Sequence, residues 1–337
     1  MVVFKILKYL GITVVTLAVL VAIGFFLGIF GIPQLNSIDN EFGTVNETTT
    51  EIQTNVSVNN PNPIGVSFGG LAINYTVDMN SVEMATGQKQ GLRIETGNSS
   101  LGFVTYLDNT KIPDWWYTHI RNGEQTDVVI NATVSHSLFG SAPPITQGQG
   151  IETDILSAFD STETREVNAG VPTDPVLYLN ETAGEYGSNL TREQTPIDLA
   201  FTMYNPKSYP YTISEIGYTI EMNDIRVGNG STTEEQVLEP RTETTLDAKT
   251  VIRNEKLDEW WVSHLQNDEV TELYIDFYVV VEPDLPGSTP IRIDSDELDY
   301  RTTIETNILG SQGGSSGDNA TAAVDSPQSQ SVAVPAT

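Results

Sequence analysis

The sequence predicts a mainly β protein: two tandem antiparallel sandwiches, each with one short helix, behind a single N-terminal transmembrane helix. Three observations lead to this prediction: an uncharged apolar run near the N-terminus, several short segments in which apolar and polar residues alternate, and a tryptophan-bearing segment that occurs twice. Alternation with a period of two is typical of half-buried strands. Cysteine is absent, which excludes disulfides, thiolate nucleophiles and Cys-ligated metals.

The apolar run predicts a membrane anchor over residues 10–32, after a cytoplasmic stub of residues 1–9. As a helix these 23 residues span ~34 Å, against a hydrocarbon core of ~30 Å. A secretory signal peptide is the alternative, but residues 28–33 lack the small-x-small cleavage pattern. Lys5 and Lys8 precede the run, so the positive-inside rule predicts a cytoplasmic N-terminus and an exterior location for everything after Pro33.

Glycosylation sequons support the exterior location. Asn-x-Ser/Thr occurs nine times, always beyond the predicted anchor, and marks surface positions in secreted proteins. The candidate N-glycosylation sites are Asn46, Asn55, Asn74, Asn98, Asn131, Asn180, Asn189, Asn229 and Asn319. Thr-rich and Asn-rich strands also form sequons by chance, which is the alternative interpretation.

The charge balance restricts the partners and suggests a host. The chain has 45 acidic and 16 basic residues, a net charge of −29. Such a surface repels nucleic acid and anionic lipid. It also repels itself in dilute salt, whereas molar salt shortens the Debye length to ~3 Å. We therefore expect a halophilic, archaeal host, with an ordinary acidic secreted protein as the alternative.

A duplication defines the domain organisation. Residues 109–124 recur as residues 254–269, with seven of sixteen positions identical at an offset of 145. The predicted units are residues 34–158 and 171–309, joined by a linker over 159–170 and followed by a disordered Gly/Ser-rich tail over 310–337. In the first unit, Ile52, Thr54, Val56 and Val58 alternate with polar residues, and residues 197–203 show the same pattern in the second unit.

The repeated segment has a helical period. Its apolar residues fall at i, i+3, i+4, i+7 and i+8, which predicts a helix of about three turns with one buried stripe. The stripes are Ile112, Trp115, Trp116, His119 and Ile120 in the first unit, and Leu257, Trp260, Trp261, His264 and Leu265 in the second. We expect each Trp→Ala substitution to cost ~3–5 kcal/mol, and a loss below ~1 kcal/mol in an unfolding titration would contradict burial.

The same stripe explains the two histidines without catalysis. His119 and His264 are expected to be packed and hydrogen-bonded, because each lies on the apolar stripe and no partner nucleophile is evident. No nucleophile-elbow, zinc-protease, phosphate-loop or dinucleotide-binding motif occurs. We predict no enzymatic activity, no cofactor and no metal, and we interpret the acidic clusters at residues 282–284 and 294–299 as solvated surface.

A turn motif carries a family resemblance. Asn60-Pro61 and Asn205-Pro206 each follow an alternating strand and precede a tyrosine-bearing strand. Both units resemble the water-stress and hypersensitive-response (WHy) domain of late-embryogenesis-abundant type 2 proteins. The resemblance implies immunoglobulin/fibronectin-III-like sandwiches, no catalytic residues, and a link to desiccation or osmotic stress. The second copy departs from the pattern at Lys207-Ser208, which puts its turn in doubt.

These observations predict a non-catalytic, membrane-anchored exterior protein that acts in the stress response. Its partners would be the membrane, through the N-terminal helix, and an unknown exterior protein, glycan or lipid. A cell-surface binding or adhesion module is the first alternative. A lipid-binding groove within the sandwich is the second.

Overall fold

The computed structural model describes residues 34–138, 140–172, 174–232, 235–294, 299–306 and 308. The predicted stub, anchor and tail, together with Asn319, lie outside these residues. In the described part of the chain, neither helix has the length and apolarity that a membrane crossing requires.

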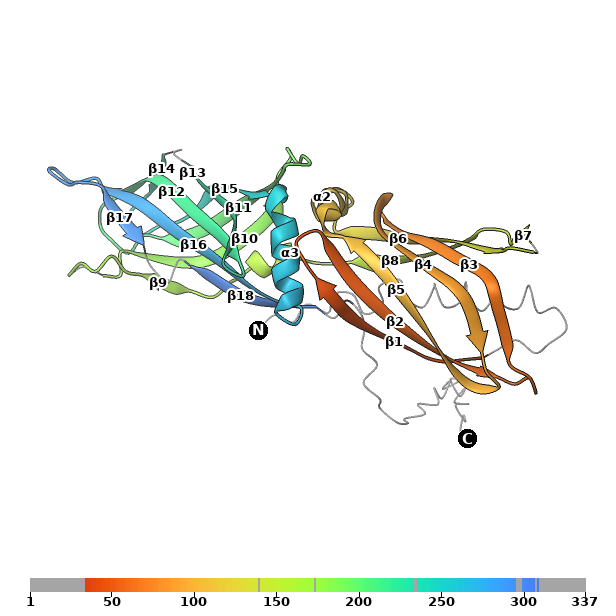
Figure 1. Ribbon diagram of the computed structural model, residues 1–337. Helices are drawn as coiled ribbons and strands as arrows, with labels where there is room; N and C mark the ends of the chain where they lie inside the picture. Colours follow the sequence, from red (N-terminus) through yellow and green to blue (C-terminus); the bar gives the residue numbers. More distant parts are fainter. Residues whose placement is uncertain are drawn as a thin grey trace, which may run out of the picture.

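The prediction of a mainly β chain with one short helix in each unit is confirmed (Figure 1). The first unit contains β1 (Gln34–Val45), β2 (Thr49–Asn60), β3 (Val66–Met79), β4 (Val82–Ile94), β5 (Gly97–Asp108), η1 (Asn109–Lys111), α2 (Ile112–Arg121), β6 (Gln125–His136), β7 (Gly140–Ser141) and β8 (Ile145–Glu152). The second contains η2 (Leu156–Phe159), β9 (Arg165–Val167), β10 (Leu177–Tyr186), β11 (Gln194–Tyr204), β12 (Tyr211–Met222), β13 (Ile225–Thr232), β14 (Gln236–Leu238), β15 (Glu243–Arg253), η3 (Asn254–Lys256), α3 (Leu257–Gln266), β16 (Val270–Pro283), β17 (Ile291–Asp294) and β18 (Tyr300–Glu305).

Each unit is one antiparallel sheet that bends into two facing layers. The strand order is β1-β2-β5-β4-β3-β6-β7 in the first unit, with β8 also on β6. The second has the order β17-β16-β12-β13-β15-β11-β10-β9, with β14 on β12 and β18 on β16. The bend lies where two long strands pair only briefly: β4 and β5 share only the pairs 85–87 with 105–107, and β13 meets β15 only at Gly228 and Ile252.

The duplication is visible in the strand register. Thr50 lies opposite Leu107 in the β2–β5 pair, and Thr195 lies opposite Ile252 in the β11–β15 pair. Both members of the second pair are displaced by 145 residues. The predicted alternation holds as well, because Ile197, Leu199, Phe201 and Met203 are all buried and their neighbours along β11 are not.

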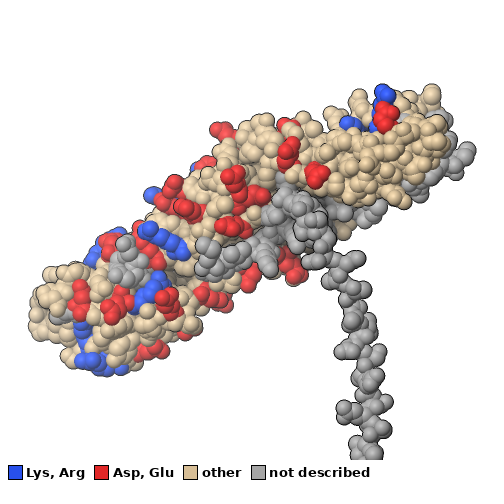
Figure 2. Space-filling view, turned by 90° about the horizontal axis from the view of Figure 1, so that it is seen from below, with Lys and Arg blue, Asp and Glu red and all other residues tan. Residues whose placement is uncertain are grey.

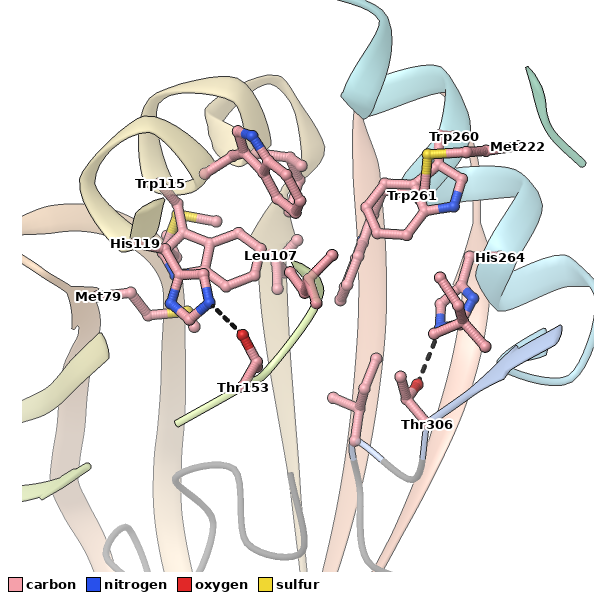
Figure 3. A pocket seen from close by; sticks show the side chains of 16 residues that line it. Met79, Leu107, Trp115, His119, Thr153, Met222, Trp260, Trp261, His264 and Thr306 are labelled. Carbon is pink, nitrogen blue, oxygen red and sulfur yellow. Dashed lines mark hydrogen bonds between the residues drawn. The ribbon is translucent and has the colours of Figure 1, made fainter. Parts of the chain in front are cut away.

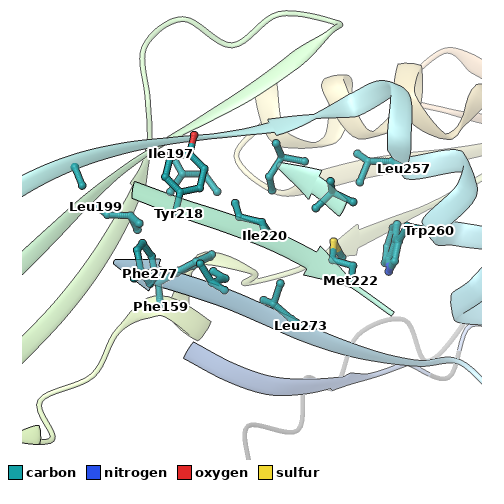
Figure 4. Close-up of a cluster of buried hydrophobic side chains, with 14 of the residues drawn as sticks. Phe159, Ile197, Leu199, Tyr218, Ile220, Met222, Leu257, Trp260, Leu273 and Phe277 are labelled. Atoms are coloured by element: carbon teal, nitrogen blue, oxygen red, sulfur yellow. The ribbon is translucent and has the colours of Figure 1, made fainter. Parts of the chain in front are cut away.

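The two units share a hydrophobic core. One cluster fills the second unit, passes through the buried faces of α2 and α3, and continues into the half of the first unit nearest the helices. Figure 4 shows its centre, where Phe159 of η2 packs among strand residues such as Phe277, with Leu257 and Trp260 at one end. A separate cluster fills the other half of the first unit. The units therefore form one body, in contrast to two independent beads.

The predicted linker differs from the structure in part. Within residues 159–170, β9 pairs with β10 and so extends the second sheet. β10 in turn pairs with β11 along most of its length. The only apolar signal for β10 is the short alternation of Leu177 and Leu179, which are both fully buried.

Candidate functional site at the junction of the units

The repeated tryptophan segments lie face to face where the two units meet. α2 and α3 each bury the five stripe residues that the periodicity predicts, and each follows a 3-10 turn that starts at a fully buried asparagine. Pro113 occupies the first turn of α2, where its missing N–H has no intrahelical partner to lose. Because a sandwich covers only one side of each helix, the tryptophans also contact the opposite unit.

Each histidine is held by two threonines. His119 Nδ1 lies 2.8 Å from Thr126 Oγ1, and His119 Nε2 lies 2.8 Å from Thr153 Oγ1. The Trp115 indole donates to the same Thr126 oxygen at 3.0 Å. In the second unit His264, Trp260, Thr271 and Thr306 repeat the arrangement, with all three distances at 2.8 Å.

The carboxylate beyond Thr153 fixes the proton positions. The Thr153 hydroxyl donates to Glu124 Oε2 at 2.6 Å, so its oxygen is left to accept a hydrogen bond from His119 Nε2–H. His119 Nδ1 then accepts from the Thr126 hydroxyl, and the imidazole is neutral. Burial favours the same state, because it lowers the pKa of His119 to about 4 despite the nearby carboxylate of Glu124.

The second unit has the same chain of donors. Burial lowers the pKa of His264 to about 4. Glu269 accepts from the Ile308 amide at 2.5 Å and from the Thr306 hydroxyl at 3.4 Å. Burial also raises the pKa of Glu269, and these two hydrogen bonds oppose that rise. Each histidine therefore joins its helix to the strand that follows it, through Nδ1, and to the residue just after β8 or β18, through Nε2.

Sequence reasoning missed the threonines and the role of Glu124 and Glu269. Thr126 and Thr271 recur at the same offset of 145 as the helices, so the duplication could have identified them. Thr153 and Thr306 differ by 153 residues and could not be paired in that way. Within the described residues, no group of three or more His, Asp or Glu side chains is placed to hold a metal ion.

Hydrogen bonds and an ion pair cross the junction. Trp116 Nε1 donates to Thr195 Oγ1 at 2.9 Å, and the Trp116 ring meets Trp260 edge to face with centroids 6.4 Å apart. Tyr186 of the second unit donates to Glu124 at 2.9 Å. Arg192 pairs with Asp114 of α2 at the surface of the same contact.

An apolar cavity of about 90 Å³ lies between the two helices. Figure 3 shows α2 with His119 on one side and α3 with His264 on the other, each histidine bonded to its threonine. The lining also includes Leu107, Met79 and Met222. This junction cavity lies between the units, whereas the lipid-binding alternative placed a groove inside a sandwich.

The junction is only approximately symmetric. Thr50 is the counterpart of Thr195 in the duplication, yet it donates to Asn109 and is not reached by Trp261. The buried Trp261 Nε1 has no hydrogen-bond partner among the described residues. The two tryptophans that correspond at an offset of 145 therefore have different environments.

The Asn-Pro turns are built alike in both units. Asn60 donates to the carbonyls of Ile64 and Glu95, at 3.2 and 3.1 Å. Asn205 donates to the corresponding carbonyls of Tyr209 and Leu238, at 2.9 and 3.0 Å. The Lys207 amide donates to Asn205 Oδ1 at 2.9 Å, as the Asn62 amide does to Asn60 at 3.1 Å. The departure at Lys207-Ser208 therefore leaves the turn unchanged, with Pro61 and Pro206 in equivalent places.

Most sequon asparagines face outward. Of the eight within the described residues, Asn180 is half-buried and the other seven are exposed. Asn55, Asn74 and Asn131 lie on strands, with their side chains on the outer faces of the layers. Attachment of a glycan at these exposed positions needs no unfolding.

Comparison with known proteins places the fold in a family. The family model described as late embryogenesis abundant protein (LEA_2) matches residues 55–148 and 200–297. An uncharacterized protein of Methanocaldococcus jannaschii is 27% identical over 97 residues, which cover 28% of this chain and 55% of the relative. The match thus spans about half the length of that relative.

Two solved structures are similar to parts of the chain. A protein from Archaeoglobus fulgidus shares 26% identity, with a TM-score of 0.34, and the match covers 39% of this chain and 99% of that one. The solution structure of AT1g01470 from Arabidopsis thaliana shares 18% identity, with a TM-score of 0.26, over 37% of this chain and 78% of that one. Since the family model matches more than half of the residues, in two tandem stretches that coincide with the two units, the chain belongs to the late embryogenesis abundant type 2 family and carries its domain twice.

Proposed function

We propose that this stress-related protein is a non-catalytic, membrane-anchored component of the cell exterior that protects the cell envelope during desiccation or osmotic stress. The observation that carries the proposal is the paired LEA type 2 domain, whose two units share a hydrophobic core, in a strongly acidic chain. Carboxylates bind water and ions strongly, so such a surface keeps a hydrated layer when water becomes scarce. Its hydrogen-bonded histidines serve packing, which supports a role without catalysis.

The acidic surface also supports a salt-loving host. Figure 2 shows red acidic side chains spread over the second unit and the junction, with blue basic side chains interspersed over the second unit. The ion pairs among the described residues involve mostly exposed side chains, with Glu221 half-buried and Asp299 buried, and leave most carboxylates uncompensated. We propose that molar salt screens the resulting repulsion, as in a haloarchaeon.

A deletion strain tests the protective role. Removal of the gene should lower survival after drying and after a sudden fall in external salt, and the intact gene on a plasmid should restore survival. A gene encoding the double variant Trp115→Ala/Trp260→Ala, which removes one buried stripe residue from each helix, should not restore it. A deletion strain that survives both treatments as well as its parent would contradict the proposal.

Protease treatment of intact cells tests the topology. We expect cleavage of the C-terminal region and of the second unit on intact cells, and protection of an epitope fused to Met1. The same epitope should become accessible only after lysis. Protection of the whole chain would refute the exterior location and leave the family assignment unaffected.

The junction cavity supports a second candidate function, the binding of a small apolar molecule. Its lining consists mainly of tryptophan, methionine and aliphatic side chains, which offer no partner to a charged ligand. Dry apolar cavities of this order of size hold molecules such as benzene. Native mass spectrometry of the protein from its own host should show an added mass that Leu107→Trp abolishes by filling the cavity. Absence of any added mass would dismiss this candidate.

A further inference from the structure

The end of the first unit that lies farthest from the helices differs in chemistry from the rest of the molecule. This outer end consists of the start of β1, the loop at residues 61–65, the turn at 95–96 and the described residues of the β6–β8 connection, 137–138 and 140–144. β1 and β2 pair from Gln34 and Asn59, and β3 begins five residues before its Leu71–His136 pair, so these segments lie at one end of the sandwich. They are at the right-hand end of Figure 1.

Exposed apolar side chains gather there. Leu138 is 82% exposed, Ile64 53% and Leu35 40%, and these are three of the six large hydrophobic residues that are exposed in the described part of the chain. Their loops are held in shape: Asn60 donates to the Ile64 carbonyl, and the Leu138 amide donates to His136 Nδ1 at 3.1 Å. The protein therefore presents these side chains to its surroundings from fixed backbone positions.

The same end is nearly free of charge in a chain of net charge −29. Its three connections contain one charged residue, Glu95, and Arg93 pairs with it at 2.6 Å. In Figure 2 the corresponding end of the molecule is mostly tan. Contact of this end with a lipid surface would therefore remove very few charged side chains from water.

The second unit provides an internal comparison. Its corresponding connections, at residues 205–210, 239–242 and 284–290, contain four charged residues: Lys207, Glu239, Arg241 and Asp284. The Asn-Pro turn and the last hairpin occupy the same places in both copies. Because the two units share a fold, the fold alone does not account for the smaller number of charged residues at the first outer end.

The length of the connection identifies those surroundings. Only Pro33 separates the apolar run that ends at Ile32 from Gln34, the first residue of β1. Two residues reach at most ~7 Å, and the headgroup layer is ~5–7 Å deep on each side of the hydrocarbon core. If the membrane span ends at Ile32, the connection is too short to hold the outer end beyond the headgroup layer.

We propose that the outer end of the first unit rests on the membrane, with Ile64 and Leu138 inserted among the lipid headgroups. This inference rests on the proposed anchor and adds a second, loop-borne contact to it. The first unit then stands upright as a spacer, because β1 runs from the outer end toward the junction, ~40 Å for its twelve residues. The acidic second unit is held away from the bilayer, where its charge meets no lipid.

Single-cysteine labelling tests the contact, and the chain suits it because it contains no cysteine. The full-length variants Ile64→Cys, Leu138→Cys and Leu285→Cys would each carry an environment-sensitive fluorophore, in phosphatidylcholine vesicles with or without lipid spin-labelled near its headgroup. Leu285 is the matched control, since it is 45% exposed in the corresponding hairpin of the second unit.

We expect blue-shifted emission and strong quenching by the spin label at positions 64 and 138, and neither at position 285. Protein that floats with the vesicles but shows equal, weak quenching at all three positions would overturn this inference while leaving the anchor intact. Protein that fails to float with the vesicles would overturn the anchor and this inference together.

Discussion

At the residue scale, one indole hydrogen bond distinguishes two tryptophans that the sequence makes equivalent. Trp116 Nε1 donates to Thr195 across the junction, and Trp261 Nε1 has no partner among the described residues. Trp116→Phe should therefore lower the free energy of unfolding by ~1 kcal/mol more than Trp261→Phe, because only the first loses a hydrogen bond. Urea titration of the two variants measures the difference, and equal losses would contradict the assigned bond.

The buried histidines predict a loss of stability in acid. Burial lowers the pKa of His119 and His264 from 6.5 to about 4, so between these values the unfolded chain binds protons that the folded chain excludes. Stability therefore falls as the pH decreases from 6.5 to 4, by roughly 2–3 kcal/mol for each histidine, and is insensitive to these groups above that window.

The double variant His119→Gln/His264→Gln isolates this effect from the many carboxylates. It should be less stable than the parent at neutral pH, since glutamine replaces only part of each hydrogen-bond pair. Its stability should decrease less steeply between pH 6.5 and 4, as measured by thermal unfolding at several pH values. Parallel curves for parent and variant would mean that the histidines titrate normally.

At the scale of elements, the Asn-Pro turn depends on the asparagine side chain. Asn205 is fully buried and bonds three backbone groups that join the turn to the β14–β15 connection. Asn205→Ala should cost ~2–3 kcal/mol, because buried carbonyls lose their donor. Asn189→Ala, in the exposed turn between β10 and β11, is the control and should change stability by less than ~0.5 kcal/mol. Denaturant unfolding measures the loss of stability in each variant. Similar losses in the two variants would contradict the structural role assigned to the Asn205 side chain.

The elements also show where prediction from sequence succeeds. The helical stripes and the alternating strands β2 and β11 follow directly from their periods, because each buries one face. β9 and β10 lack an extended pattern, since β10 is ordered by backbone pairing with β11 and by its buried leucines, and β9 is ordered by pairing with β10. Backbone pairing of that kind leaves little trace in the side chains.

At the scale of the whole molecule, the charge predicts a dependence on salt. With a net charge of −29 and few ion pairs among the residues that the structure describes, the folded protein should be stabilised by KCl well into the molar range, where screening is nearly complete. Chemical unfolding at increasing KCl measures this dependence. A parallel titration with equimolar sucrose separates charge screening from the stabilisation that any solute excluded from the protein surface would give. If the free energy of unfolding does not change with KCl, the argument for a halophilic host fails.

The sequence by itself determined the duplication, the β architecture, the two helices with their buried stripes, and the acidic surface. Local periodicity and composition set these properties, and both can be read along the chain. Only the tertiary structure decided that the two stripes face each other, that Trp116 bonds across the junction while Trp261 does not, and that a cavity lies between them. The reason is physical. A helical stripe indicates that one face of the helix is buried, but the residues that cover this face are far away in the chain, and the local sequence does not identify them.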